Sequence, residues 1–481
     1  MKEKLRQLSE FKWLIPKGVR PAMRVNAIFY ASKSLLDSAE DTAIEQLTNV
    51  ACLPGVLEPV LGMPDMHWGY GLPMGAVGAF DENEGIISSG CTGYDINCGV
   101  HMLRTNLTAD EVKPKIKKLI DTLFNNIPCG VGATSKLRLS HAEMDKVFVQ
   151  GARWAVEHGY GIEEDLERIE EKGCIPGANP SKISSQAMSR GVPQLGTLGA
   201  GNHFLEVQAV DQIYEPSIAK VFGITNKGQV TIMVHCGSRG LGHQVASDYL
   251  RIHESAARKY GIKLPDPQLV CAPAKSREGQ DYLGAMRAAA NYAFCNRQII
   301  AHWVRESFAQ VFGKKWEDME MYTVYDVAHN ICKLEEHTVN GKRQRVYVHR
   351  KGATRAFPPG HKDVPSVYRS VGQPVLIAGS MGTASYILVG TDKAMAETFG
   401  SSCHGAGRSM SRHAAIKRFR GETIKRELEN TGKALRATHP KILAEEAPTA
   451  YKDVDAVVDS VHGAGISKKV ARVVPIGIAK G

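Results

Sequence analysis

A glycine-rich stretch, Gly90–Val100, places a carboxylate and a thiol close together in the chain. The carboxylate is Asp95 and the thiol is Cys98, and the glycines around them permit a tight, irregular backbone. A short loop or one helical turn would direct both side chains toward one point. Such a pair is a candidate for metal ligation. The alternative is a structural turn with a buried Cys, because free Cys packs as a small hydrophobic residue.

A second glycine-rich stretch, Gln194–Glu206, contains Asn202 and His203, with Glu206 one turn later. A loop of this kind lets backbone N–H groups approach a phosphate. It is not a P-loop, because no Gly-Lys-Ser/Thr follows, and its glycine spacing does not match a dinucleotide-binding fingerprint. The motif therefore favours a functional loop over the alternative, a strand-turn-strand with a polar tip.

Two more histidines stand at the ends of β-rich apolar runs. His235 follows Val230–Val234, and His329 follows the run that starts at Met321, with Asn330 next to it. Side chains at strand ends often build the sites of α/β proteins. Two such runs, each ending in His, are harder to dismiss as structural than one.

One carboxylate, one thiol and three imidazoles are enough ligands for two metal ions if the thiol of Cys98 bridges them. The set consists of Asp95, Cys98, His203, His235 and His329. A thiolate with imidazoles suits zinc or iron, whereas manganese prefers oxygen-rich sites. Ligand types alone therefore do not select the metal.

His404 lies outside this set, in a glycine-rich segment of its own. Gly405 and Gly407 follow it closely, and Arg408 and Arg412 come next. The four-residue spacing predicts that the two arginines share one face of a helix. An imidazole can attack phosphorus while guanidinium groups stabilise the charge that develops. The segment thus indicates phosphoryl chemistry, with a solvated basic helix as the alternative.

Hydrophobic periodicity and turn chemistry predict the elements that position these side chains. Helices are expected over residues 39–47, 108–126, 140–158, 243–260, 281–312 and 453–461, and strands over 76–80, 85–88, 230–234, 321–327 and a hairpin at 335–350. Gly62–Gly75 is dense in Gly and Pro and is predicted to be a loop, in which Asp65 and His67 are site candidates. For His67, capping a loop carbonyl is an equally good explanation. Lys480 ends an apolar tail, which favours a tail tucked into the protein.

Composition bounds the class of protein. The 481 residues are 43% hydrophobic and 23% charged, as in ordinary globular proteins, and 60 Lys and Arg against 50 Asp and Glu give a net charge of +10. The positive balance suits a polyanionic partner. The ten cysteines form no C-x-x-C pair, no signal-peptide pattern opens the chain, and no apolar run is long enough for a membrane helix. We expect a cytoplasmic protein, with no membrane partner, whose residues 1–481 form one large intertwined domain of mixed α/β class.

Four motifs carry a close resemblance to the RtcB family of RNA ligases. They are Gly93–Val100, Leu195–Glu206, Val234–Gly242 and Ser402–Arg408, and the resemblance extends over nearly the whole chain. It implies the RtcB-type fold and an enzyme that joins an RNA 3′-phosphate or 2′,3′-cyclic phosphate to a 5′-hydroxyl, using GTP and two manganese ions, in tRNA splicing and RNA repair. The pair Cys91-Thr92 departs from the Gly-Val more usual in the family, and we do not expect it to change the reaction.

The resemblance also implies a role for each matching residue. Asp95, Cys98 and His203 would hold one manganese, Cys98, His235 and His329 the other, and His404 would be guanylylated. The positions that would bind GTP or GMP are Asn202, His203, Phe204, Leu205, Glu206, His329, Asn330, Ala378, Gly379, Ser380, Met381, Ser385, His404, Gly405, Ala406, Gly407, Tyr451 and Lys480. The positions that would bind RNA phosphates are Arg190, Arg239, Arg408 and Arg412.

Two other functions remain open from the residues alone. A metal-dependent phosphoesterase would hydrolyse RNA ends without joining them, and a non-enzymatic RNA-binding protein would need only the positive charge. The ligase alone would form a covalent phosphoamidate with GTP. Its expected partners are GTP and RNA, in the form of cleaved tRNA halves or broken RNA ends, and an archease-type activator is a candidate further partner.

Overall fold

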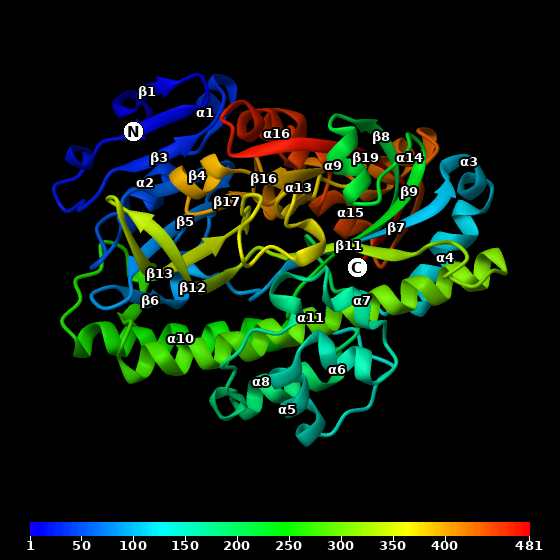
Figure 1. Cartoon of the computed structure of the whole chain (residues 1–481), viewed down its shortest axis with the longest axis horizontal. Coiled ribbons are helices and arrows are strands. Elements are labelled where there is room, and N and C mark those ends of the chain that lie inside the picture. Colours follow the sequence, from blue (N-terminus) through cyan, green and yellow to red (C-terminus); the bar gives the residue numbers. More distant parts are fainter.

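Two large β-sheets lie side by side along two long helices in the computed structural model, which describes residues 1–481 (Figure 1). The first sheet has, in spatial order, β1 (Arg6–Ser9), β2 (Lys12–Ile15), β3 (Ala27–Tyr30), β4 (Val60–His67), β5 (Met74–Asp81), β13 (Lys342–Lys351) and β12 (Ile331–Val339). The predicted hairpin is confirmed in β12 and β13. Asn340 and Gly341 join these strands with φ angles of 52° and 76°, as a tight hairpin turn requires.

Most of the predicted metal ligands lie at or next to the ends of strands in the second sheet. Its strands are, in spatial order, β11 (Tyr322–Ala328), β7 (Gly99–Thr108), β9 (Gln229–Cys236), β8 (Phe204–Ile213), β19 (Ser467–Lys480), β16 (Ser385–Gly390) and β15 (Pro374–Ile377), and β18 (Ala434–Ala437) pairs with β19. The apolar tail is β19, which lies between β8 and β16. The expected burial of the tail is confirmed, because Lys480 is only 2% exposed.

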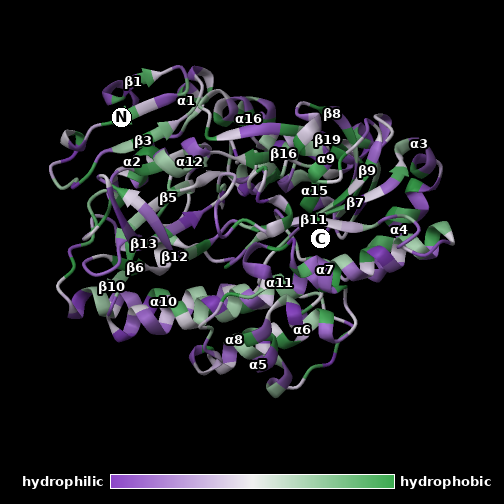
Figure 2. Ribbon diagram, in the orientation of Figure 1, coloured by the Kyte–Doolittle hydropathy of each residue, from purple (hydrophilic) through white to green (hydrophobic).

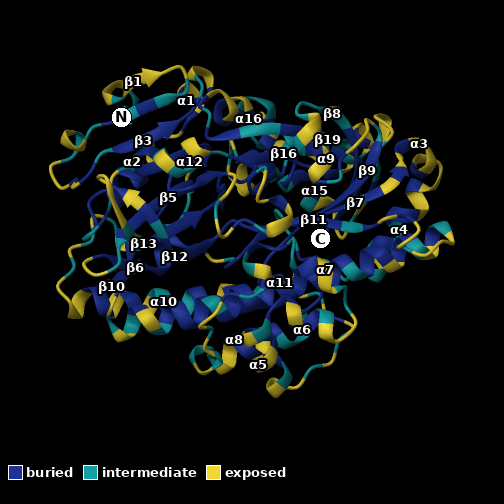
Figure 3. Ribbon diagram, viewed as in Figure 1, coloured by how far each residue is buried: buried dark blue, intermediate teal, exposed yellow.

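The longest helix, α11 (Arg277–Phe312), runs along the interior rather than over the surface. Ser276 caps its start and Gly313, with a left-handed φ of 66°, ends it. The helix is buried on all sides along much of its length, as its small and apolar composition allows. Figure 3 shows α11 and the central strands in the colour of buried residues, with exposed residues mainly on outer helices and loops.

The remaining helices cover the sheets and the long helix. They are α1 (Lys33–Ser38), α2 (Asp41–Val50), α3 (Ala109–Val112), α4 (Ile116–Asn126), α5 (His141–Gln150), α6 (Ala152–Glu157), α7 (Glu163–Leu166), α8 (Ser185–Gly191), α9 (Pro216–Val221), α10 (Arg239–Lys259), α12 (Asp392–Glu397), α13 (Arg412–Arg418), α14 (Gly421–Asn430), α15 (Pro440–Glu445) and α16 (Val454–Gly463). Two small sheets pair β6 (Ile86–Ser88) with β10 (Cys271–Pro273), and β14 (Ala353–Arg355) with β17 (Ser401–Cys403).

The prediction of a loop over Gly62–Gly75 is wrong for most of that stretch. Strand β4 continues to His67 and β5 begins at Met74, so only the six residues between them form the turn. The glycine and proline are tolerated because β4 is irregular there: its regular pairing with β5 is interrupted between Gly62 and His67. Asp65 therefore sits on a strand rather than in a mobile loop.

Two predicted helices are interrupted, and one predicted helical face does not form. Pro114 lies in a 3₁₀ turn that separates α3 from α4, and Gly151, with φ 59°, separates α5 from α6. Capping boxes begin α3 and α5 as predicted. Arg408 and Arg412 do not share a helical face, because α13 begins only at Arg412.

The mixed α/β class expected from the sequence is confirmed. Each large sheet has its own large apolar cluster: one packs α11 and its neighbouring helices against β7, β8 and β9, and the other packs α2 and α16 against the first sheet. Figure 2 shows hydrophobic residues concentrated on the inner strands, whereas helices such as α5 and α10 carry hydrophilic outer faces. None of the helices combines the length and the apolar character needed to span a membrane.

Candidate active site

Four neighbouring strands of the second sheet bring the predicted metal ligands to one edge. Strand β7 runs antiparallel to both β9 and β11, and β9 runs antiparallel to β8. The start of β7, the ends of β9 and β11 and the start of β8 therefore lie together. Asp95 and Cys98 precede β7, His203 precedes β8, His235 lies near the end of β9, and His329 follows β11.

The ligand atoms of Asp95, Cys98 and His203 all lie within 4.8 Å of one another, so these residues could hold a metal ion. Nε2 of His203 is 2.8 Å from Oδ2 of Asp95, and Sγ of Cys98 is 3.5 Å from the same nitrogen. On its other side, Sγ of Cys98 is 3.3 Å from Nε2 of His235. The ring centroids of His235 and His329 are 5.2 Å apart. The thiol of Cys98 thus contacts both His203 and His235, and His329 lies next to His235.

The side chain of Arg297 and a backbone carbonyl of α11 hold the loop that carries Asp95 and Cys98. Nη1 of Arg297 donates to the carbonyl of Asn97 at 2.7 Å, and Asn97 in turn donates to the carbonyl of Ala290 at 2.7 Å. Gly99 is required here, because a Cβ atom would lie 2.2 Å from the carbonyl oxygen of Val327. The loop therefore packs tightly against the neighbouring strand and the helix.

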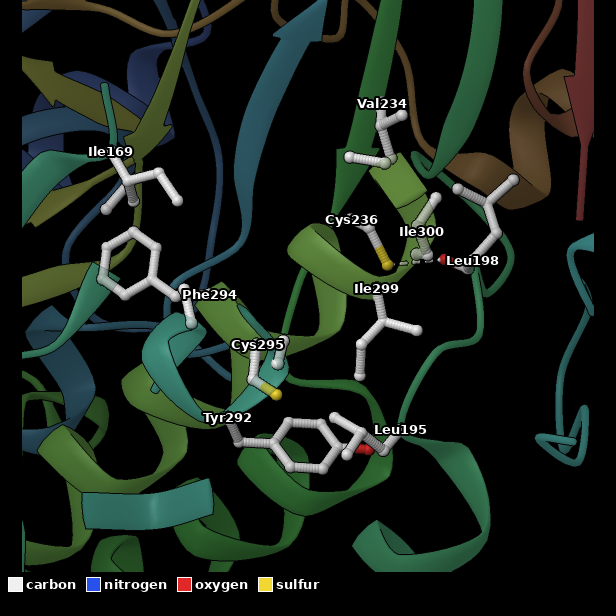
Figure 4. Packing of buried hydrophobic residues seen from close by; sticks show 14 of the residues in the cluster. Ile169, Leu195, Leu198, Val234, Cys236, Tyr292, Phe294, Cys295, Ile299 and Ile300 are labelled. Carbon is white, nitrogen blue, oxygen red and sulfur yellow. Dashed lines mark hydrogen bonds between the residues drawn. The ribbon is translucent and has the colours of Figure 1, made fainter. Parts of the chain in front are cut away.

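Apolar side chains of the same helix support the segment that carries His203. Figure 4 shows Ile299 and Ile300 of α11 close to Cys236 and Leu198, which flank the site. The thiol of Cys236 donates to the carbonyl of Leu198 at 2.8 Å. Asn296, one turn along α11, accepts from the backbone N–H of Gly196 at 2.6 Å. The helix thus fixes both sides of the ligand cluster.

Burial determines the protonation of the cluster. It lowers the pKa values of His235 and His329 well below their usual range, so both imidazoles are neutral and can act as ligands. Burial, with the nearby carboxylate of Asp95, raises the pKa of the Cys98 thiol well above its usual value. Burial alone would also raise the pKa of Asp95, but His203 beside it holds that pKa below its usual range.

The donor set fits a divalent metal. Both ring nitrogens of His329 and Nδ1 of His203 are buried without a hydrogen-bond partner. Buried polar atoms are normally satisfied, so these nitrogens are positioned for something other than the protein. A metal ion would supply the positive charge that a thiolate next to a carboxylate needs.

His404 lies beside this cluster and is held by a carboxylate from the first sheet. Oδ2 of Asp65 accepts from Nδ1 of His404 at 2.6 Å and from its backbone N–H at 3.1 Å. Burial alone would raise the pKa of Asp65, but His404 holds that pKa below its usual value, so the carboxylate is ionised. In the neutral ring this hydrogen bond requires the proton on Nδ1, and the lone pair then lies on Nε2. The ring of His404 is 5.0 Å from that of His329.

Two cavities meet at His404. The larger, of about 880 Å³, contains the metal-ligand cluster and the side chains of Arg190, Arg239 and Arg412. The smaller, of about 40 Å³, is bounded by many of the predicted guanylate-binding residues: Asn202, Phe204, Ala378, Gly379, Ser380, Met381, Gly405, Ala406, Gly407, Tyr451 and Lys480. Met74, Asn202, His235 and His404 line both.

The residues around the small cavity are tied to one another. The guanidinium of Arg408 donates to Oε1 of Glu446 at 3.2 Å and to the hydroxyl of Tyr451 at 3.0 Å, and it lies over the tyrosine ring. Nζ of Lys480 is 3.6 Å from the same glutamate. Oε1 of Glu206 is buried without a partner, and burial raises the pKa of this carboxyl to about 7. Glu206 itself is not among the residues that line this cavity, so its unpaired oxygen is an acceptor that a ligand reaches only after the cavity widens.

Three of the four arginines predicted for RNA lie in the large cavity, and one does not. Arg190 lies in the last turn of α8, Arg239 begins α10 and Arg412 begins α13. Arg239 has a positive φ of 55°, an uncommon conformation for a residue other than Gly. Arg408 borders the small cavity instead, where Glu446 and Tyr451 engage it.

Two residues of the site have roles that the sequence does not predict. Asp65 is a site candidate from its loop-like, glycine-rich surroundings, but nothing near it in the chain links it to His404. Glu446 directly follows another glutamate, as is typical of a surface segment. Only the structure shows that Glu446 is buried, with 1% of its surface exposed. His67, the other candidate of that stretch, pairs its Nδ1 with the carbonyl of Asp65 at 2.9 Å. This contact matches the structural explanation for His67, in which its ring caps a carbonyl.

A cluster of metal-type ligands, an oriented histidine and three arginines around one cavity is the arrangement of a protein that handles phosphate groups. The comparison with known proteins specifies the family. The family model described as tRNA-splicing ligase RtcB matches residues 46–481. The chain belongs to the RtcB family.

Relatives in several archaea match the chain over its full length. A tRNA-splicing ligase RtcB of Archaeoglobus fulgidus is 60% identical over 477 residues, which is 99% of both chains. The protein of the same name in Thermococcus kodakarensis is 58% identical over 478 residues, again 99% of both chains. The one in Methanococcus maripaludis is 51% identical over 481 residues, 100% of both. The resemblance seen in four motifs is thus confirmed over the whole chain.

Proposed function

We propose that the chain is a GTP-dependent RNA ligase that joins a 3′-phosphate or 2′,3′-cyclic phosphate end to a 5′-hydroxyl end. Membership of a family described as tRNA-splicing ligases supports ligation of tRNA halves, and repair of broken RNA would use the same chemistry. The observation that carries the proposal is the position of His404: Asp65 holds its ring through Nδ1, at the junction of the small cavity bounded by the predicted guanylate-binding residues and the large cation-lined cavity.

In the first step, Nε2 of His404 attacks the α-phosphorus of GTP. The new N–P bond forms as the bond to the β-phosphate oxygen breaks, and pyrophosphate leaves. Asp65 keeps the ring proton on Nδ1 and stabilises the positive charge that the ring acquires. Without this carboxylate, the imidazole would be free to adopt the tautomer that lacks a lone pair on Nε2.

The guanylate then passes to the RNA. The 3′-phosphate attacks the phosphoamidate and releases His404, which gives an RNA end activated by a pyrophosphate link to guanosine. The 5′-hydroxyl attacks the RNA phosphate and GMP leaves. Where the RNA carries a cyclic phosphate, water must first open it to the 3′-phosphate. The cations of the large cavity, Arg190, Arg239 and Arg412, would hold the RNA phosphates during these steps.

We propose two manganese ions as the metals. Asp95, Cys98 and His203 would hold one, and Cys98, His235 and His329 would hold the other, with Cys98 shared. When bound, such ions neutralise phosphate charge and act as Lewis acids. The position of Cys98 between His203 and His235 supports the shared role.

Guanylate binding requires the small cavity to widen. Its 40 Å³ is far below the roughly 300 Å³ at which small-molecule pockets begin. Tyr451 is the residue to move, because its hydroxyl reaches Asn202 at 3.4 Å across the cavity. With its ring turned aside, Tyr451 would stack on the guanine, while Glu206 and Lys480 contact the polar edge of the base.

Transfer of label from GTP tests the proposal. Incubation with α-labelled GTP and manganese should produce a protein-bound label that is acid-labile and base-stable, as a phosphoamidate is. His404→Ala should abolish this label while metal content and folding persist. Normal RNA ligation by that variant would exclude the assigned nucleophile, and hydrolysis of RNA ends without any label would favour the phosphoesterase.

All ten cysteines are free, which supports a reducing, cytoplasmic setting. We also propose an archease-type activator as a partner. Measuring the rate of RNA ligation with and without such a protein tests this.

A further inference from the structure

One wall of the large cavity carries three aromatic rings that the chemistry above does not use. We call Tyr70, Tyr94 and His243 the aromatic ledge. The rings of Tyr70 and Tyr94 are 5.5 Å apart between centroids and meet edge to face, and the rings of Tyr94 and His243 are 6.2 Å apart and nearly parallel, with 26° between their planes. All three residues line the 880 Å³ cavity, and none lines the small one.

The ledge is built from three separate segments. Tyr70 lies in the turn between β4 and β5, Tyr94 lies directly before Asp95, and His243 lies in the first turns of α10. Tyr94 is 37% exposed, so other residues of the protein do not cover its side chain fully. The backbone carbonyl of Tyr70 accepts a hydrogen bond from the buried Lys351, which fixes the turn. An aromatic surface held in this way is available to a ligand.

The same cavity supplies the charge that a nucleic acid needs. Three arginines line the cavity together with the ledge: Arg190, Arg239 and Arg412. After burial, which is the largest cause, their positive charges further lower the pKa of His243, so all three lie within electrostatic reach of that ring. Cations that track a backbone, beside aromatic rings on which bases stack, are the combination used for single-stranded nucleic acid. A terminal base in a duplex is held by its pairing partner and by its inner neighbour, so it is not free to turn onto such a surface.

We propose that the aromatic ledge stacks an unpaired nucleobase at an RNA end, so that the enzyme selects single-stranded ends. This inference rests on the proposed ligase function and adds a selectivity that the reaction itself does not require. Tyr94 is the central contact, because it adjoins both other rings and its own neighbour in the chain, Asp95, belongs to the metal-ligand cluster. Stacking there would hold the end of the strand next to the reacting phosphate.

Abasic RNA tests the proposal against the matching protein variants. Two RNA strands are ligated with the base missing from the last nucleotide of the 3′-phosphate strand, from the first nucleotide of the 5′-hydroxyl strand, or from neither. Stacking on an aromatic residue is worth about 1–3 kcal/mol per base, so kcat/KM of the unaltered protein should fall about 5- to 150-fold with one of the abasic strands. The strand that shows the loss is the one whose end lies on the ledge.

Tyr94→Leu should reduce kcat/KM on normal RNA by a similar factor. It should cause little further loss on the abasic strand, because the same contact is already absent there. Tyr94→Phe keeps the ring and should retain ligation. His243→Leu repeats the test on a residue away from Asp95. Tyr260→Leu is the matched control: this tyrosine follows α10, is 41% exposed and is outside the cavity, so it should change nothing.

Guanylylation of His404 without RNA separates this inference from the proposed function. If all the variants accept label from GTP normally and the abasic strands are ligated as well as normal RNA, the ledge has no such role and the ligase assignment stands. Equal ligation of blunt, fully paired ends and of unpaired ends would also overturn it. If the unaltered protein takes no label from GTP, the proposed function fails instead.

Discussion

Asp65 and His404 are 339 residues apart in the chain, yet Oδ2 of Asp65 accepts from both the ring and the backbone N–H of His404. The carboxylate comes from the irregular end of β4 in the first sheet, and the imidazole follows β17. Gly407 makes the approach feasible, because a Cβ there would lie 2.3 Å from the carbonyl oxygen of Asp65. The contact fixes both the orientation and the tautomer of the ring.

Asp65→Asn should therefore slow guanylylation of His404 by about 10²–10⁴-fold, the range of a positioned acid–base partner. The amide can hold the ring in the wrong tautomer, which places the proton on Nε2. Labelling with α-labelled GTP in single-turnover experiments measures the rate, and thermal unfolding shows whether the variant is folded. A folded variant that labels at the normal rate would remove Asp65 from the mechanism.

Substitution of Cys98 should affect both metals, whereas substitution of His329 should affect one. Cys98 lies between His203 and His235, but His329 lies only on the His235 side. After loading with manganese and desalting, Cys98→Ala should retain almost none, and His329→Ala should retain about half of the normal content. Elemental analysis gives the ratio of metal to chain. Equal losses in the two variants would contradict a shared thiolate.

Guanosine binding should strengthen as pH rises from 6 to 8. Burial raises the pKa of Glu206 to about 7, so its carboxyl is mostly protonated at pH 6 and mostly ionised at pH 8. The ionised form accepts from the N–H groups of guanine. One pH unit below the pKa only about a tenth of the chains carry the carboxylate, and Kd should be about tenfold weaker there. Calorimetry with guanosine, which has no phosphate to titrate, measures this.

The control for that experiment is Glu206→Gln, which has no proton to lose and should give a Kd independent of pH over the same range. His404→Asn can serve as the background in both cases, so that no other group at the junction of the cavities titrates. A pH dependence that survives in Glu206→Gln would assign the effect to a different group.

Arg412→Ala and Arg408→Ala should differ in their effect on RNA binding. Arg412 lines the large cavity and its side chain is half exposed, whereas Arg408 is buried against Glu446 and Tyr451. Loss of one phosphate contact should reduce the slope of log K against log salt by about one in Arg412→Ala. Arg408→Ala should leave this slope unchanged and weaken guanylylation instead. Binding of labelled RNA between low and moderate salt distinguishes them.

Arg305→Ala should destabilise the protein by about 3–5 kcal/mol. Both terminal nitrogens of this arginine donate to Asp165 at 2.7 Å, and both side chains are only 1% exposed, so the substitution leaves a buried carboxylate without its partner. Denaturant unfolding measures the change. The control is Arg258→Ala, which breaks the exposed pair with Glu254 and should cost less than about 1 kcal/mol. Similar losses in both would exclude the buried pair as a special contribution.

Local pattern in the sequence predicted the elements and most of the residues that converge on the site. Strands form over both β-rich runs, although β9 continues to Cys236 and so includes His235, because a short run of apolar and β-branched residues favours a buried strand through local interactions. The turn at Asn340-Gly341 and both capping boxes depend on neighbours two or three positions away. The loop of Asp95 and Cys98 also closes locally, with the N–H of Cys98 donating to the carbonyl of Asp95 at 3.0 Å.

Only the tertiary structure decided which distant residues meet. The order of β11, β7, β9 and β8 brings the metal-type ligands to one edge, and that order is not readable from any single run. No single run of sequence predicts the contact of Asp65 with His404, the burial of Glu446, or the hydrogen bond from Arg408 to Tyr451 either. The physical reason is range: propensities and turns act between near neighbours, whereas these contacts depend on how whole sheets pack around α11.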